Sequence, residues 1–298
     1  LQTFAGYSFL SLPIVIGSDK NEYPAKVWRF ENNGQFEKNC VVEIEYTVDN
    51  YKGKQQLNIT SIKKAPDEMI AEFVPTSEYD GKSVFAMLLN KVNDFKDQEL
   101  KDIVKSILLE RREKLEIYPA AYRLHHAIVG GLMLHTASIV EMAEKTCQVY
   151  PNIDRELLLS GAILHDVAKT FEMETDKTGL CTGYTVSGEL IGHLVKGAMM
   201  VDEAAKKLGI TSEKVILLEH MIISHHELPE YGAAVRPKFL EAEILATLDA
   251  LDATIFEINA ATSKVEPGNF TDRQWALDSR KLYNHGLSST EHTVNLGE

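Results

Sequence analysis

The stretch LLLSGAILHDVAKTFEM, residues 157–173, places His165 and Asp166 side by side within a predicted buried helix. A carboxylate loses most of its solvation on an apolar helix face, so it persists there only when it is paired, hydrogen-bonded or bound to a metal. Lys169 follows Asp166 by three residues and therefore shares its helix face. The stretch predicts a buried polar centre, where Lys169 either offers its charge to a phosphate or extends to solvent at the helix end.

The same helical pattern extends over most of the chain. Apolar residues recur at three- and four-residue spacing from Asp67 to about Ala261. Residues 1–66 differ, because apolar and polar residues alternate in four or five short runs separated by Asn, Gly and Asp. The pattern predicts an α+β chain of two domains. We expect a small β-barrel over 1–66, a helical linker region over 67–118, an all-α bundle over 119–262 and a polar C-terminal extension over 263–298.

Composition limits the class of protein. With 298 residues, of which 44% are hydrophobic, the chain can bury cores for two domains. Its three cysteines lie far apart, which argues against a disulfide framework and a thiolate zinc site. No apolar run of membrane-spanning length occurs, and LQTFAGYSFL at residues 1–10 lacks the features of a secretory signal. We therefore expect a cytoplasmic protein that does not contact membranes.

Charge divides unevenly along the chain. The net charge of −13 by itself disfavours binding to nucleic acid, because phosphates are attracted to basic surfaces. Residues 1–66, however, contain 8 Lys or Arg and 7 Asp or Glu, so nearly all of the negative charge lies beyond them. This asymmetry indicates two domains with different tasks. The helices between Ser83 and Glu116 suit a spacer or a self-association surface, so a homo-oligomer is one expectation.

Further histidines and aspartates lie at the apolar edges of other predicted helices, namely His135, His193, His225, His226 and Asp249. Any one of these histidines alone is more often a hydrogen-bonded core residue than a ligand. Several helices that each present an imidazole or a carboxylate to the interior of a bundle are typical of a bundle metal site. Nitrogen and oxygen donors without sulfur suit manganese, iron, cobalt, nickel or zinc.

The order of these residues, with His165 and Asp166 between His135 and His193, resembles the ligand signature of the HD superfamily of metal-dependent phosphohydrolases in its two-metal form. Within it, YPAAYRLHHAIVGGLMLHT (118–136) and LLLSGAILHDVAKTFE, after a small β-domain, resemble the YhaM-type 3'-5' exoribonucleases. The resemblance implies an OB-fold domain before an HD domain, and two divalent ions, manganese first. Leu134 departs from it, since an acidic residue often precedes the first ligand histidine in those proteins.

The resemblance also implies a mechanism. Asp166 would bridge the two ions, and a water shared between them would be a hydroxide at neutral pH. Hydroxide attack on phosphorus builds negative charge that the ions stabilise, with Lys169 as a candidate helper.

Three other polar residues lie near the predicted ligands in the sequence, namely His125, His126 and Asp252. His125 and His126 precede His135 by ten and nine residues, and nine steps along one straight helix turn about 900°. We therefore expect His126 to face away from His135. Either residue is expected to contact substrate phosphate, to support a ligand as a second-layer residue or to cap the helix. Asp252 lies one turn beyond Asp249 and is the alternative ligand, but the resemblance favours Asp249 as the ligand, with Asp252 as a second-layer residue. His220 is expected in the core.

The β-domain has its own candidate residues. OB-folds bind single strands by stacking bases on aromatic side chains in a groove of positive charge. The candidates are Trp28, Arg29, Tyr51, Lys52 and Lys54, with Lys26, Phe30 and Tyr46 beside them. Trp28 suits the barrel core equally well, whereas Tyr51 lies in a predicted turn and is the preferred stacking residue.

Three functions remain open from the sequence. The first is a metal-dependent 3'-5' exoribonuclease on single-stranded RNA, with single-stranded DNA as a further substrate. The second is an HD phosphodiesterase that acts on a cyclic or small nucleotide. The third is a nucleic-acid-binding protein with a structural bundle, which the complete ligand set disfavours. Dependence on substrate length would separate the first function from the second.

Overall fold

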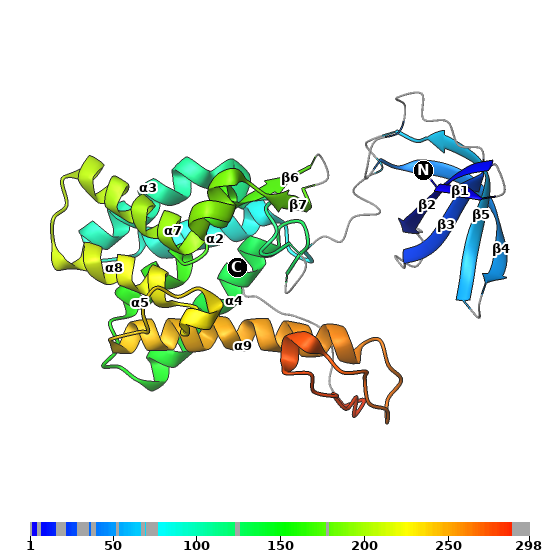
Figure 1. Ribbon diagram of the computed structural model, residues 1–298. Helices are drawn as coiled ribbons and strands as arrows, with labels where there is room; N and C mark the ends of the chain where they lie inside the picture. The colour runs from blue at the N-terminus through cyan, green and yellow to red at the C-terminus, as the bar shows by residue number, and fades with distance from the viewer. Residues whose placement is uncertain are drawn as a thin grey trace. The chain divides into compact units, whose positions relative to one another are not determined.

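The computed structural model describes residues 2–4, 7–15, 22–28, 36, 40–51, 54–66, 69, 77–122, 126–176 and 179–287 (Figure 1). The chain divides into two compact units, Leu1–Pro75 and Thr76–Glu298. The first contains β-strands and the second is mainly helical. The predicted α+β class, with a β-domain before a helical bundle, is therefore confirmed.

The first unit is one five-stranded sheet. Its strands are β1 (Gln2–Phe4), β2 (Tyr7–Val15), β3 (Glu22–Trp28), β4 (Val42–Tyr51) and β5 (Lys54–Lys64). They lie in the order β1-β2-β3-β5-β4, and only the β3–β5 pair is parallel. The sheet is OB-like. Among the described residues β1 and β4 are its edges, and no described strand pair closes it into a barrel.

Alternation along β3 separates the core of this sheet from its other face. Ala25 and Val27 are buried with Leu57 of β5, whereas Trp28 is 42% exposed. Because successive side chains of a strand lie on opposite faces, Trp28 lies on the face opposite Val27. Trp28 is thus not a core residue of the unit. Arg29, Phe30 and Lys52 lie outside the described residues.

The second unit is a helical bundle with one small hairpin. Its helices are α2 (Gly81–Asn93), α3 (Gln98–Leu115), α4 (Gly131–Val149), α5 (Arg155–Leu164), α6 (Lys169–Glu172), α7 (Val186–Leu208), α8 (Glu213–Ser224) and α9 (Leu240–Thr262). β6 (Met173–Thr175) pairs with β7 (Cys181–Tyr184), and the 3-10 turns are η2 (Pro229–Tyr231) and η3 (Trp275–Leu277). The long helix α9 packs against α4, α5 and α8 (Figure 1).

One apolar core holds the helices together. α2 and α3 contribute Phe85 and Leu108 to it, beside Ile139 of α4 and Leu158 of α5. Residues 81–115 therefore share their core with the helices that follow. No helix among the described residues is long and apolar enough to cross a membrane.

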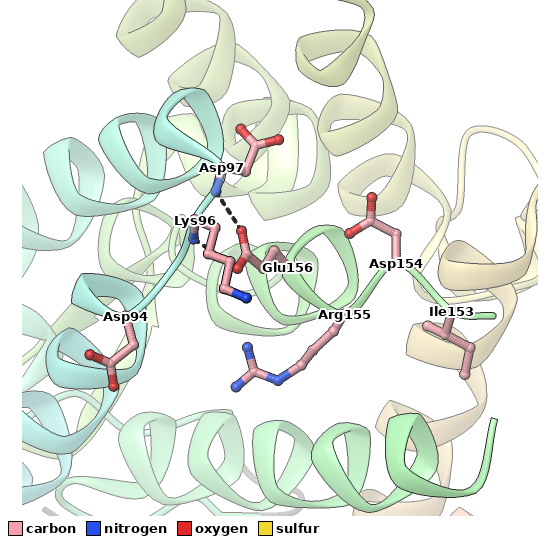
Figure 2. A pocket seen from close by; sticks show the side chains of 7 residues that line it. All are labelled: Asp94, Lys96, Asp97, Ile153, Asp154, Arg155 and Glu156. Carbon is pink, nitrogen blue, oxygen red and sulfur yellow. Dashed lines mark hydrogen bonds between the residues drawn. The ribbon is translucent and has the colours of Figure 1, made fainter. Parts of the chain in front are cut away.

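Polar contacts fix where the helices begin. The carboxylates of Asp97 and Asp154 accept hydrogen bonds from the third backbone N–H of α3 and α5, which stabilises each helix start. Glu156 also accepts the backbone N–H groups of Lys96 and Asp97, at 2.8 and 2.7 Å, and so joins the two helix starts. Figure 2 shows the pocket at this junction, lined by Asp94, Lys96, Asp97, Ile153, Asp154, Arg155 and Glu156. None of the predicted site residues lines it.

Gly81 marks the closest approach of α2 to the end of α3. A Cβ atom at Gly81 would lie 1.9 Å from the carbonyl oxygen of Glu116, which is a backbone atom and cannot rotate away. We expect Gly81→Ala to lower the free energy of unfolding by about 1–3 kcal/mol, as overpacking does. Urea denaturation measures this loss. Gly183→Ala is the control, because a Cβ atom there has no neighbour within 4 Å, and equal stability of the two variants would contradict the prediction.

Candidate metal centre

The predicted ligands converge from five places in the bundle. His135 lies in the second turn of α4, and His165 and Asp166 follow the end of α5. His193 lies in α7, His225 and His226 follow α8, and Asp249 lies in α9. The structure therefore brings all seven residues of the predicted ligand set toward one centre.

The predicted single buried helix through His165 and Asp166 is wrong in detail. α5 ends at Leu164, and a short turn leads into α6 at Lys169. The turn carries Asp166 into the interior, where Lys169 Nζ lies 2.7 Å from Asp166 Oδ2. Asp166 is only 2% exposed, so the pair is a buried ion pair.

Four residues form the first group of donors, namely His135, His165, Asp166 and Asp249. Asp166 contributes its Oδ2 atom to this group. The Nε2 atoms of His135 and His165 lie 3.6 and 3.4 Å from Asp166 Oδ2. They also lie 3.2 Å from each other. Asp249 Oδ1 completes the group at 3.1 Å from His135 Nε2 and 3.9 Å from His165 Nε2.

Asp166 Oδ1 faces the second group, defined as Asp166, His193, His225 and His226. The Nε2 atoms of His193 and His225 lie 3.4 and 3.6 Å from Asp166 Oδ1. Donor atoms of all four residues lie within 4.8 Å of one another. One carboxylate thus belongs to both groups, with one oxygen in each.

Each of the five imidazoles is held through its other ring nitrogen. The Nδ1 atoms of His165, His225 and His226 contact the carbonyl oxygens of Ala162, Ile222 and Tyr231 at 2.7–2.9 Å. A carbonyl can only accept, so each of these Nδ1 atoms carries a proton and donates it. Nε2 of each ring is then left with its lone pair, as a metal ligand requires, and Nε2 of His165 and of His225 lies 3.4 and 3.6 Å from Asp166.

Carboxylates hold the two remaining rings. His135 Nδ1 lies 2.7 Å from Asp252 Oδ2, and His193 Nδ1 lies 2.8 Å from Glu172 Oε1. Asp252 thus contacts His135 directly, and its second-layer role stays a prediction.

Electrostatics favours positive charge in the first group. Burial lowers the pKa of His135, but its hydrogen bonds to Asp249 and Asp252 outweigh burial and raise that pKa to about 9. Burial alone would raise the pKa of Asp249, but the contacts with His135 outweigh burial. The pKa is lowered below its usual value, so the carboxyl is ionised. A cation is therefore favoured between His135 Nε2 and Asp249 Oδ1, whether a proton or a metal ion supplies the charge.

The second group differs, because burial dominates there and lowers the pKa of His225 to about 3. Burial also lowers the pKa of His226. Asp166 is ionised, because Lys169 and His165 outweigh its burial and hold its pKa well below the usual value. Neutral imidazoles beside an ionised carboxylate form a donor set ready for a cation.

Three buried atoms test whether the residues fit a metal. Asp166 Oδ1, His193 Nε2 and His225 Nε2 have no hydrogen-bond partner among the described residues. Unpaired lone pairs that face one another at such distances repel, and buried polar groups of this kind are costly. A divalent cation would satisfy all three, so the residues fit the metal that the sequence predicted.

The structure corrects the expectation for His126. The assumption of one straight helix is wrong, because α4 begins at Gly131 and His126 precedes it in a left-handed conformation. The ring of His126 lies 5.6 Å from that of His135, between centroids, and both contact Asp252. His125 lies outside the described residues.

His220 also departs from its expected place. It is half-buried rather than in the core, and its Nε2 accepts the backbone N–H of Lys238.

Sequence reasoning missed Glu172. Its Oε1 accepts both the backbone N–H of His193, at 3.0 Å, and the ring Nδ1–H, at 2.8 Å. The backbone N–H is available because Gly192, at φ 73°, interrupts α7 just before His193. Glu172 lies 21 residues before His193, so no helical spacing could have paired them.

Comparison with known proteins agrees with this geometry. The family model of the HD domain matches residues 132–254, which include every residue of both groups. The helical unit is therefore an HD domain, and its two His/Asp groups indicate that the chain binds divalent metal. No solved structure matches the chain.

Curated relatives match nearly the whole chain. A protein of Geobacillus sp. (strain WCH70) is 32% identical over 95% of this chain and 88% of its own length. A protein of Bacillus pumilus is 31% identical over 93% of this chain and 88% of its own length. A protein of Listeria monocytogenes is 32% identical over 94% of this chain and 89% of its own length. Each carries the name 3'-5' exoribonuclease YhaM. This chain belongs to the YhaM family.

Glu172 gives a direct test of the centre. We expect Glu172→Ala to weaken binding of divalent metal by about 10- to 100-fold, because His193 loses the acceptor that orients its ring. Isothermal titration of Mn²⁺ into the full chain, previously dialysed against chelator, measures the affinity. Glu174→Ala is the control, since that neighbouring side chain is exposed. Unchanged affinity in Glu172→Ala would show that Glu172 does not support the centre.

Proposed function

We propose that this chain is a metal-dependent 3'-5' exoribonuclease that hydrolyses single-stranded RNA, and single-stranded DNA as a further substrate. The observation that carries the proposal is the sharing of Asp166, whose two oxygens face two separate groups of nitrogen donors. That arrangement suits two ions bridged by one carboxylate, as in two-metal phosphoryl chemistry. The polymer substrate and the 3'-5' polarity come from the names of the relatives.

The metal ligands follow from the two groups. His135, His165, Asp166 and Asp249 would hold one ion, and Asp166, His193, His225 and His226 the other. Manganese is the first choice, with iron, cobalt, nickel or zinc as alternatives for nitrogen and oxygen donors. Two such ions supply an activated water and stabilise negative charge on a phosphate.

The chain's own residues orient this chemistry. Hydrogen bonds at Nδ1 hold the five rings in place. Four of them, those of His135, His165, His193 and His225, place Nε2 3.4–3.6 Å from an oxygen of Asp166. Lys169 is buried beside Asp166, and the contact outweighs burial and raises the pKa of Lys169, so its ammonium is charged. We assign Lys169 the stabilisation of charge on the non-bridging phosphate oxygens, because a fixed buried cation stabilises developing negative charge strongly.

Residues of the first unit, Leu1–Pro75, here called the β-unit, would bind single-stranded RNA. Trp28 offers an exposed ring, and Lys26 Nζ lies 6.0 Å from the centre of that ring. Tyr51 and Lys54 are backbone partners at the end of the β4–β5 hairpin. Aromatic rings with adjacent cations suit stacked bases and their phosphates. Arg29 and Lys52 are the remaining residues of this proposed surface.

Two further proposals concern the whole protein. The three cysteines are free, which supports a reducing compartment such as the cytoplasm. Self-association through the helices between Ser83 and Glu116 stays a prediction, and sedimentation of the purified chain would test it.

Incubation of Mn²⁺-loaded protein with a 5'-labelled single-stranded RNA of about twenty nucleotides tests the function, because that length exceeds the site of one OB-fold. We expect a ladder that shortens from the 3' end. Asp166→Asn should slow it by about 10³-fold or more, because loss of the bridging carboxylate removes several kcal/mol of transition-state stabilisation.

An intact RNA beside cleavage of bis-p-nitrophenyl phosphate would instead indicate a small-nucleotide phosphodiesterase. Retention of wild-type turnover in Asp166→Asn would contradict the assigned centre. Circular dichroism of the variant serves as the control for folding.

Trp28 tests the role of the β-unit. We expect Trp28→Ala to weaken binding of the twenty-nucleotide RNA by about 1–3 kcal/mol, the value of one stacked base, and to spare hydrolysis of bis-p-nitrophenyl phosphate. Fluorescence anisotropy of labelled RNA measures the binding. Tyr150→Ala, which removes an exposed ring from the helical unit, is the matched control. Equal loss on both substrates would indicate a folding defect rather than a lost contact.

A further inference from the structure

His126 is an unusual residue for a loop before a helix. It is 1% exposed and has φ at 52°, in the left-handed region that residues other than glycine seldom adopt. Such backbone strain persists only where surrounding contacts determine it, and it concentrates at functional sites. The burial also excludes His126 from direct contact with the phosphates of a polymer.

The side chain of His126 belongs to a chain of hydrogen bonds. Its Nε2 lies 2.9 Å from Asp252 Oδ2, and His135 Nδ1 lies 2.7 Å from the same oxygen. One carboxylate oxygen thus accepts from two imidazoles, one of which belongs to the first metal group. Asp252 is itself 6% exposed, so water gives it little support.

Other contacts fix His126 from behind. Its ring packs on Phe256 with centroids 4.3 Å apart, and its carbonyl accepts the backbone N–H of Ala120 at 3.1 Å. Phe256 and Asp252 lie one turn apart on α9, the helix that also carries Asp249. The loop before α4 is therefore attached to the helix that provides ligands and their supports.

We infer that His126 is a positioning residue that sets the metal affinity of the first group by holding Asp252 against His135. This inference rests on the proposed function, because it assumes that His135 binds an ion through Nε2. His126 fixes one acceptor oxygen of Asp252, Asp252 fixes the proton on His135 Nδ1, and the His135 Nε2 lone pair stays directed into the group. Partners of this kind typically change metal affinity by 10- to 100-fold.

Titration of Mn²⁺ into the full chain, followed by calorimetry, tests the inference with a readout that does not depend on activity. His126→Phe keeps a flat ring on Phe256 but removes the donor, and we expect it to weaken one of two binding events by about 10-fold. His126→Gln retains an N–H group at similar reach and should restore most of the affinity. The binding event of the second group should not change.

Two controls separate the hydrogen bond from packing and backbone strain. Asn tolerates the left-handed conformation but its amide is too short to reach Asp252, so His126→Asn should bind as weakly as His126→Phe. His220→Phe removes another imidazole that packs on a phenylalanine, Phe239, outside both groups, and should bind Mn²⁺ as the wild type does.

Wild-type affinity in folded His126→Phe or His126→Asn would overturn the inference while leaving the proposed function intact. If His126→Phe does not fold, the comparison of His126→Asn with His126→Gln decides between the two outcomes. Absence of Mn²⁺ binding by the wild-type chain would overturn the proposed function itself.

Discussion

The buried carboxylate of Asp166 is the constraint on which the rest of the helical unit depends. An ionised carboxylate that is 2% exposed needs compensation, and a single ion pair with Lys169 satisfies only one of its oxygens. The other oxygen faces imidazole lone pairs, which cannot donate to it. A cation would satisfy these polar atoms. The need to bind one explains why five separate segments of the bundle place buried polar residues at the same point.

A second layer of hydrogen bonds orients the imidazole rings around Asp166. Backbone carbonyls hold three imidazoles and carboxylates hold the other two, so all five rings present the same nitrogen to the centre. The carbonyls come from the same or adjacent turns, whereas Glu172 and Asp252 come from other helices. Local backbone geometry therefore orients His165, His225 and His226, and only tertiary packing orients His135 and His193. Helix packing and metal geometry are consequently coupled, because movement of α6 or α9 would turn a ligand ring.

The two units of the chain differ in character. Among the described residues of the first unit, Ala25, Val27, Leu57 and Ile59 form a buried apolar cluster, and seven partly buried apolar residues pack against it. The ring of Trp28 lies on the face opposite this core and is 42% exposed. The helical unit has a large apolar core and contains both groups of His and Asp donors. The uneven distribution of charge along the sequence follows a similar division, since residues 1–66 contain 8 Lys or Arg and 7 Asp or Glu, and nearly all of the negative charge lies beyond them.

The sequence by itself determined the class of fold, the order of the ligands and the nitrogen and oxygen character of the centre. Those features follow from local periodicity and residue chemistry, which are written along the chain. It did not determine that a turn interrupts the helix at His165, that Gly192 frees a backbone N–H for Glu172, or that His126 lies against Asp252. These contacts join residues 21 to 126 positions apart, or depend on a backbone break that no periodic pattern encodes. Only the packing of the helices brings such residues together, because hydrogen bonds require alignment within a few tenths of an ångström that sequence spacing cannot specify.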